Sequence, residues 1–203
     1  MSNVPRRALT VLLTACAVAA TMSSAGTATA GTGSTGSSVT PTQLGPLVSA
    51  VAERLSTADA VAAAKWGTGK PIDDPAREAE VLRAVAEQGR RENLDPSRVE
   101  QVFRDQIEAS KDVQRGLFAY WSAVPQAVPE PRPDLASVRP VLDRLNVEIV
   151  AQMSAHRRVL AGPGCLPDLL EGAADVVASG RPDVLHQAGL ARALRSVCGA
   201  VSG

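Results

Sequence analysis

The sequence predicts a single all-α domain of six helices, and three observations lead to that prediction. Alanine, leucine, arginine, glutamate and valine are abundant, whereas aromatic residues make up only 2% of the 203 residues. This composition favours helices over sheet. Apolar residues recur at spacings of three and four along several long stretches, as they do on the buried side of a helix. Proline and glycine separate these stretches, so each stretch is expected to be one helix.

Residues 1–30 have the anatomy of a secretory signal peptide. Arg6 and Arg7 precede an apolar run, and small residues follow it up to Ala30. We therefore expect cleavage after Ala30 and a protein that is secreted or held in a periplasm-like space. The residues before Cys16 resemble a bacterial lipobox, so lipid anchoring at Cys16 is the second interpretation; it ranks lower because the apolar run continues past this cysteine.

Residues 31–43 are small and polar without periodicity and predict a disordered lead-in, so the helical domain is assigned to residues 44–203. No later stretch reaches the length of a membrane span, which predicts a soluble mature protein. All 21 acidic residues but only 19 of the 21 basic residues follow residue 30, giving a net charge of about −2. This balance argues against nucleic acid as a partner.

The first helix is predicted over residues 44–66, and it carries two cations beside its apolar stripe. The stripe consists of Leu47, Val51, Leu55, Ala58, Ala62 and Trp66. Arg54 and Lys65 are close to three whole turns apart, so their side chains project the same way with Cα atoms roughly 16 Å apart. That separation leaves room for a small anion between them. The alternative is that each reaches solvent or pairs with an acid such as Glu53 or Asp59.

Two Asp-Pro pairs predict the next two helices. Asp74 caps a helix over residues 75–91, and Arg77 lies in its first turn, where free N–H groups and the helix dipole favour an anion. Asp95 opens a longer helix over residues 96–122.

Three uncharged polar residues interrupt the apolar stripe of this third helix. Gln106, Ser110 and Gln114 occupy positions at which buried residues are expected. An unpaired polar group on a buried face costs about 1 to 3 kcal/mol, so each should have a partner. Ser110 and Gln114 are one turn apart. A purely structural explanation is that Ser110 bonds to a backbone carbonyl and that Gln114 pairs with another helix.

The second half of the chain continues the helical pattern. Four prolines in residues 124–134 predict an extended connector that is not helical. A fourth helix is expected from about residues 134–137 to Leu160, and Pro140 is tolerable only in its first turn, which places Arg139 at the helix start. Two shorter helices, over residues 166–179 and 182–199, complete the domain.

Cys165 and Cys198 are the two cysteines that remain after cleavage. In an exported chain a disulfide is the default, and it would staple the C-terminal helical hairpin. The closed loop corresponds to a stabilisation of about 3 to 4 kcal/mol in the chain-entropy model.

Four cations on core-facing edges or helix starts, together with the polar residues of the third helix, predict one cationic pocket inside a helical bundle. The four are Arg54, Lys65, Arg77 and Arg139. Such a pocket offers positive charge and neutral hydrogen-bond donors. His156 and His186 are too isolated for a histidine metal site, and the sequence contains no Gly-rich phosphate loop, nucleophile elbow or Ser-His-Asp set. We therefore expect no metal, no cofactor and no covalent intermediate.

The chain resembles the exported subclass of the all-helical chorismate mutases. The resemblance spans nearly the whole mature chain and lies in ERLSTADAVAAAKW (53–66), PIDDPARE (71–78), VFRDQIEASKDVQ (102–114), PDLASVRPVLDRLN (133–146) and the late cysteine pair. It implies an isomerase of aromatic amino-acid biosynthesis that rearranges the dianion chorismate to prephenate.

The resemblance also implies roles for individual residues. Arg54 and Arg139 are expected to bind the two carboxylates, with Arg77 and Ser110 supporting the dianion. Lys65 and Gln114 are expected to donate to the ether oxygen and so to be catalytic.

Asp74 and Glu78 match positions that contact the substrate hydroxyl in some members of the family, Asp74 through its backbone. The resemblance further implies that each chain holds its own complete site, and it leaves homodimerisation open.

Two other functions fit the same pattern. An isochorismate-pyruvate lyase shares the fold and much of the pocket. A secreted helical module that binds some other anion without catalysis would also explain the buried cations and the disulfide.

Overall fold

The structure is a computed structural model that describes residues 42–199, and the predicted signal peptide and most of the lead-in lie outside the described residues. All regular secondary structure in this part of the chain is helical. Its elements are α1 (Gly45–Lys65), α2 (Pro75–Arg91), α3 (Pro96–Ala123), the 3-10 turn η1 (Pro125–Ala127), α4 (Leu135–Ala155), α5 (Arg157–Leu160), α6 (Cys165–Gly180) and α7 (Val184–Ala193). None of the described helices is long and apolar enough to cross a membrane.

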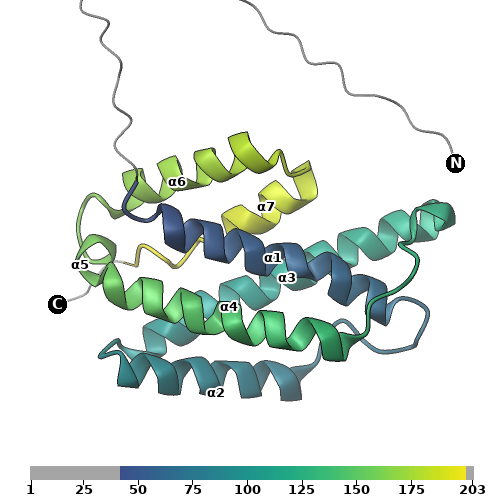
Figure 1. Cartoon of the computed structure of the whole chain (residues 1–203), viewed down its shortest axis with the longest axis horizontal. Helices are drawn as coiled ribbons and strands as arrows, with labels where there is room; N and C mark the ends of the chain where they lie inside the picture. Colours follow the sequence, from purple (N-terminus) through teal and green to yellow (C-terminus); the bar gives the residue numbers. More distant parts are fainter. Residues whose placement is uncertain (1–41, 200–203) are drawn as a thin grey trace, which may run out of the picture. The chain divides into compact units, whose positions relative to one another are not determined.

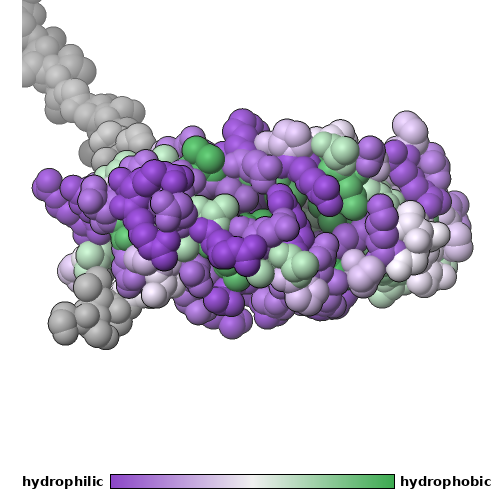
Figure 2. Space-filling view, turned by 90° about the horizontal axis from the view of Figure 1, so that it is seen from below, coloured by the Kyte–Doolittle hydropathy of each residue, from purple (hydrophilic) through white to green (hydrophobic). Residues whose placement is uncertain are grey.

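Helix α1 is the central element of the bundle (Figure 1). It packs against α3, α4, α6 and α7, and α2 packs against α3 and α4. The predicted stripe of α1 forms much of the core, since Leu47, Val51 and Ala58 are fully buried. The view from below in Figure 2 shows a face that is mostly hydrophilic, with hydrophobic residues in the recesses.

The predicted helix starts are confirmed by their caps. The Asp74 carboxylate accepts the backbone N–H of Arg77, and the Asp95 carboxylate accepts that of Ser97. Asp134 and Asp183 cap α4 and α7 in the same way. These side chains satisfy backbone donors that a helix leaves free at its first turn.

Several predicted boundaries are wrong. The structure has seven α-helices in its described part where the sequence predicts six, because the fourth helix ends at Ala155 and a separate single turn, α5, follows His156. Helix α7 ends at Ala193, well before the predicted residue 199, and gives way to turns. The proline-rich connector holds a short 3-10 turn. Pro140 lies inside α4, beyond the first turn, which removes one backbone donor from the helix.

An aromatic cluster joins the end of α1 to the end of α3. The Trp66 ring meets the Phe118 ring edge to face at 5.0 Å and the Trp121 ring at 5.6 Å between centroids. The chain then turns away through Gly67 and Gly69, whose φ angles of 72° and 74° lie in the left-handed region that glycine adopts readily. The cluster therefore fixes the point at which the loop to α2 begins.

The disulfide between Cys165 and Cys198 is present, with Cα atoms 5.8 Å apart. It links the start of α6 to the turns that follow α7. At the same end of the molecule, Asp168 of α6 accepts backbone N–H groups from Gln43 and Leu44, at 3.0 and 2.6 Å. These contacts attach the segment before α1 to α6.

Candidate active site

All eight residues assigned to the site from the sequence line one pocket between α1, α2, α3 and α4. They are Arg54, Lys65, Asp74, Arg77, Glu78, Ser110, Gln114 and Arg139. The pocket holds about 830 Å³ of empty space when the solvent at its mouth is included. Apolar side chains complete the lining, among them Val61, Val81 and Leu142. Such a mixture of an apolar wall and a few converging polar groups is typical of small-molecule sites.

Arg54 is a buried cation without a carboxylate partner among the described residues. It is 5% exposed, donates from Nε to the Asn146 side-chain oxygen at 2.8 Å, and lies over the Phe103 ring. Burial lowers the pKa of Arg54 to about 10. The acids considered as partners from the sequence are engaged elsewhere: Glu53 pairs with Arg144, and Asp59 pairs with His186.

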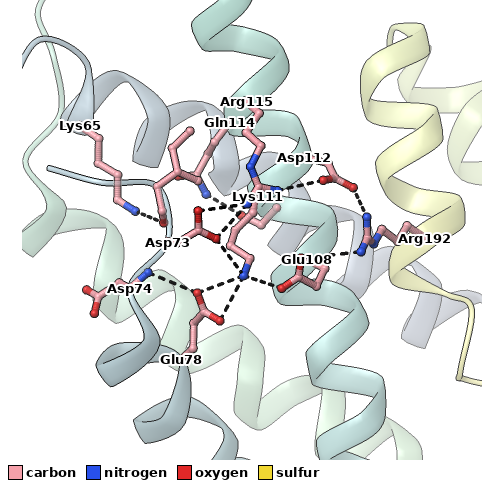
Figure 3. Close-up of polar contacts among 12 residues, drawn as sticks. Lys65, Asp73, Asp74, Glu78, Glu108, Lys111, Asp112, Gln114, Arg115 and Arg192 are labelled. Atoms are coloured by element: carbon pink, nitrogen blue, oxygen red, sulfur yellow. Dashed lines mark hydrogen bonds and ion pairs between the residues drawn. The ribbon is translucent and has the colours of Figure 1, made fainter. Parts of the chain in front are cut away.

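Lys65 is half-buried at the end of α1 and donates from Nζ to the Ile72 carbonyl at 2.8 Å. Figure 3 shows this contact at the edge of the site. Burial lowers the pKa of Lys65 below its ordinary value, and Asp74, Asp73 and Glu78 partly oppose that shift. The ammonium group has two further N–H donors for a ligand.

Arg77 and Arg139 differ in how they are held. Arg77 donates to Glu80 at 3.0 Å and, across the gap to α4, to Asp143 at 3.2 Å. The Arg139 side chain is exposed and lines the pocket, and it makes no hydrogen bond or ion pair within residues 42–199. It lies one turn into α4, slightly beyond the helix start that the sequence predicts. A ligand can therefore bind the Arg139 side chain directly, but to bind Arg77 it must compete with the carboxylates of Glu80 and Asp143.

Ser110 and Gln114 face each other on α3, since the Gln114 amide nitrogen donates to the Ser110 hydroxyl at 3.2 Å. Across the described helices, the Ser110 hydroxyl therefore does not bond to a backbone carbonyl, and the Gln114 amide does not pair with another helix, as the purely structural explanation would require. The Gln114 side-chain oxygen is buried without a partner in the described structure. Gln106 departs from expectation, because both of its buried polar atoms also lack a partner there.

Sequence reasoning missed three polar residues of the pocket, namely Asn146, Lys111 and Asp143. Asn146 carries the same signal as Gln114, since it is a polar residue on the apolar stripe of its helix. Lys111 has no such signal, because a lysine beside a glutamate on a helix is normally a solvated surface pair. Here Lys111 is 8% exposed.

The site supplies positive charge and hydrogen-bond donors and has no activated nucleophile. The described residues contain no group of three or more His, Cys, Asp and Glu side chains placed to hold a metal ion. Cations with few internal partners beside a buried amide suit a small, multiply charged anion.

Comparison with known proteins identifies the family. The model of the chorismate mutase type II family matches residues 46–115. The secreted chorismate mutase of Mycolicibacterium smegmatis is 44% identical over 156 residues, which cover 76% of this chain and 86% of the relative. This chain belongs to the chorismate mutase type II family. It is therefore a chorismate mutase, an isomerase.

Further chorismate mutases agree with this assignment. The secreted chorismate mutase of Mycobacterium tuberculosis is 38% identical over 159 residues, covering 78% of this chain and 80% of that protein. The crystal structure of the chorismate mutase from Burkholderia thailandensis superposes with a TM-score of 0.73 at 39% identity, covering 77% of this chain and 99% of the other. The all-helical chorismate mutase fold predicted from the sequence is confirmed.

Proposed function

We propose that the pocket between α1 and α4 is the site at which this chorismate mutase rearranges chorismate to prephenate. The observation that carries the proposal is the convergence of Arg54, Lys65, Arg139 and Gln114 on one pocket in which none of them pairs with a carboxylate of the described chain. In this site Arg54 and Arg139 bind the two carboxylates of the substrate.

The chemistry needs no more than these groups provide. The rearrangement breaks a C–O bond while a C–C bond forms within one molecule, so it requires no nucleophile, proton transfer or cofactor. Binding both carboxylates holds the enolpyruvyl arm over the ring, which removes the entropic cost of reaching the reactive conformer. Lys65 and Gln114 donate to the ether oxygen, where negative charge grows in the transition state. Arg77 and Ser110 add donors around the same dianion.

Asp74 and Glu78 are assigned to the substrate hydroxyl. The Asp74 backbone N–H already donates to the Glu78 carboxylate at 3.3 Å. The two residues therefore form one unit at the start of α2, and Glu78 is the acceptor available to a hydroxyl that enters the pocket.

Replacement of the two proposed ether-oxygen donors tests the assignment. Lys65→Ala and Gln114→Ala should each lower kcat roughly 10²-fold or more, because each removes a donor to developing charge. Exposed residues of the same types, Lys70→Ala and Gln101→Ala, serve as matched controls and should leave kcat unchanged. The assay follows the loss of chorismate absorbance. Turnover like that of the wild type in either site variant would contradict the proposal.

Product analysis addresses the two other functions that fit the sequence. Incubation with chorismate and with isochorismate should yield prephenate from the first and no salicylate from the second. Salicylate would indicate the lyase, and unchanged chorismate would indicate an anion-binding module without catalysis.

We also propose that the protein is exported, as the two mycobacterial relatives are by their names. The support is the basic, apolar and small-residue sequence of residues 1–30. Mass spectrometry of the mature N-terminus should find a chain that begins after Ala30; a chain that begins at a lipid-modified Cys16 would instead indicate the anchored form.

A further inference from the structure

Lys111 lies at the centre of a cluster of acids beside the proposed site. Its Nζ lies 3.2 Å from Asp73 and 3.2 Å from Glu78, and it also contacts Glu108 (Figure 3). These acids come from the loop before α2, from α2 and from α3 itself. An ammonium group has three N–H donors, so the three acids can occupy all of them.

Lys111 differs in this respect from the cations assigned to the substrate. Arg54 and Lys65 donate only to neutral oxygens, at 2.8 Å each. Burial lowers the pKa of Lys111, but hydrogen bonds with Glu108, Glu78 and Asp73 outweigh that effect and raise the pKa above its ordinary value. Lys111 is thus already paired with three carboxylates, unlike the cations assigned to the substrate carboxylates.

Glu78 depends on Lys111 more than the other two acids do. Asp73 also accepts from Arg115, at 2.8 and 3.1 Å, and Glu108 also lies 3.7 Å from Arg192. Within the described part of the chain, Lys111 is the single cation paired with Glu78, and it donates to both carboxylate oxygens at 3.2 Å. Without Lys111, Glu78 would be an uncompensated, half-buried negative charge in the wall of a pocket that must admit a dianion.

The network behind Lys111 holds its ammonium in place. Glu108 contacts both Lys111 and Arg192 of α7, and Asp112 joins Arg192 to Arg115 (Figure 3). The ammonium group is therefore fixed from the α7 side while it fixes Glu78 on the pocket side.

We propose that Lys111 is a positioning residue for the mutase reaction: it neutralises Glu78 and holds that carboxylate where it accepts the substrate hydroxyl. The inference rests on the proposed function, because it takes Glu78 as the hydroxyl acceptor. Lys111 acts through Glu78 and does not itself touch the substrate.

The test is a double-mutant cycle read out as KM and kcat for chorismate. Lys111→Met should raise KM about tenfold or more with kcat changed less than threefold, because it removes an interaction equal in ground and transition states. In a Glu78→Gln background the same substitution should change KM less than about threefold, since the group through which it acts is gone. Lys111→Arg keeps the charge and should restore most of the affinity. Lys70→Met is the matched control and should leave both constants unchanged.

The outcomes separate the inference from its alternatives. A purely structural role for Lys111 predicts that its effect is the same with Glu78 or Gln at position 78, and that result would overturn the inference. So would a Lys111→Met enzyme with the wild-type KM. Should Lys111→Met fail to fold, Lys111→Gln keeps hydrogen bonds to the acids without the charge and must show the same rise in KM.

Failure of the inference is distinguishable from failure of the proposed function. If Lys65→Ala and Gln114→Ala lower kcat while Lys111→Met leaves KM unchanged, the site assignment stands and the inference alone falls. If those two variants turn over chorismate like the wild type, the site itself is wrong and Lys111 cannot position a residue for it.

Discussion

At the scale of single residues, the charges of the pocket determine how activity should depend on pH. Gln114 donates from an amide that does not ionise, so kcat should change little between about pH 5 and 8. The pKa of Arg54 is about 10, and that of Lys65 lies below its ordinary value. Loss of these protons removes the positive charge that attracts the dianion, so kcat/KM should fall as the pH rises toward 10.

Steady-state kinetics across this range check the pH prediction. The kcat profile should hold to higher pH than the kcat/KM profile, because a bound dianion raises the pKa values of the cations around it. A steep loss of kcat between about pH 5 and 8 would contradict the role of Gln114 as a donor that is always available.

If Arg77 binds the substrate as proposed, its ion pair with Asp143 competes with that binding. The Arg77 guanidinium donates to Asp143 at 3.2 Å across the pocket, and both side chains are substantially exposed. Exposed ion pairs are worth about 0.2 to 1 kcal/mol, so Asp143→Asn should lower KM for chorismate by a factor between about 1.4 and 5 with kcat unchanged. The spectrophotometric assay at constant ionic strength measures both constants.

A general effect of removing one negative charge must be separated from this competition. Glu148→Gln makes the same change of charge on the same helix, at an exposed carboxylate that bonds within α4 to Gln152. It should leave KM unchanged. An equal fall in KM in both variants would mean that Asp143 does not act through Arg77.

At the scale of helices, His186 joins α7 to α1. Its ring nitrogens contact Asp183 and Asp59, each at 2.8 Å. Burial lowers the pKa of His186, but the two carboxylates raise it by more than burial lowers it, so the net pKa lies above 6.5. Because the folded state holds the proton more tightly than the unfolded state, this contribution to stability is complete below about pH 6.5 and is lost as the pH rises through the folded pKa.

His186→Gln should therefore lower the free energy of unfolding by up to about 1 kcal/mol at pH 5.5 and by clearly less at pH 8.5, since the partners are partly exposed. Urea unfolding at the two pH values measures the difference. His156→Gln, the same replacement at the other histidine, serves as the control. A loss that is equal at both pH values would show that His186 contributes by packing and not by charge.

Helix starts were predictable where local chemistry sets them, and helix ends less so. Asp74, Asp95 and Asp134 cap helices within their own first turns, and such short-range signals are present in the sequence. The break at His156 has no proline or glycine to mark it. After α7, the Ser196 hydroxyl donates to Asp105 and the Val197 carbonyl accepts from Arg98, and both partners lie on α3. Contacts between residues so distant in the sequence are not encoded in periodicity.

In the site, too, local signals were visible in the sequence and long-range contacts were not. Arg54 and Gln114 stood out because polar side chains on an apolar stripe conflict with helix periodicity. Their contacts around one pocket follow from the way α1, α3 and α4 pack. Lys111 was overlooked because its burial depends on acids from the loop before α2 and from α2, and neither contact follows from the position of Lys111 on its own helix.

At the scale of the whole molecule, the disulfide and the site occupy different parts of the bundle. The bond between Cys165 and Cys198 joins residues 33 positions apart and closes the segment that contains α6 and α7, whereas the pocket is lined by α1 to α4 and the loop before α2. Replacing both cysteines by serine should lower the free energy of unfolding by about 3 to 4 kcal/mol and leave kcat and KM unchanged while the protein is folded.

Urea unfolding and the chorismate assay together check this separation. Dithiothreitol should destabilise the wild type to the level of the double-serine variant and leave that variant unaffected. A folded double-serine variant with reduced kcat would show that the hairpin is coupled to the pocket, with Arg192 as the connection through Glu108.

The cluster at the end of α1 contains both tryptophans of the chain, Trp66 and Trp121, in mutual contact. All indole fluorescence of the protein therefore originates from one location, directly beside Lys65. The emission spectrum therefore reports on the environment of Trp66 and Trp121 alone. A shift of the emission maximum during a chorismate titration would indicate that the ligand binds at the Lys65 end of the pocket.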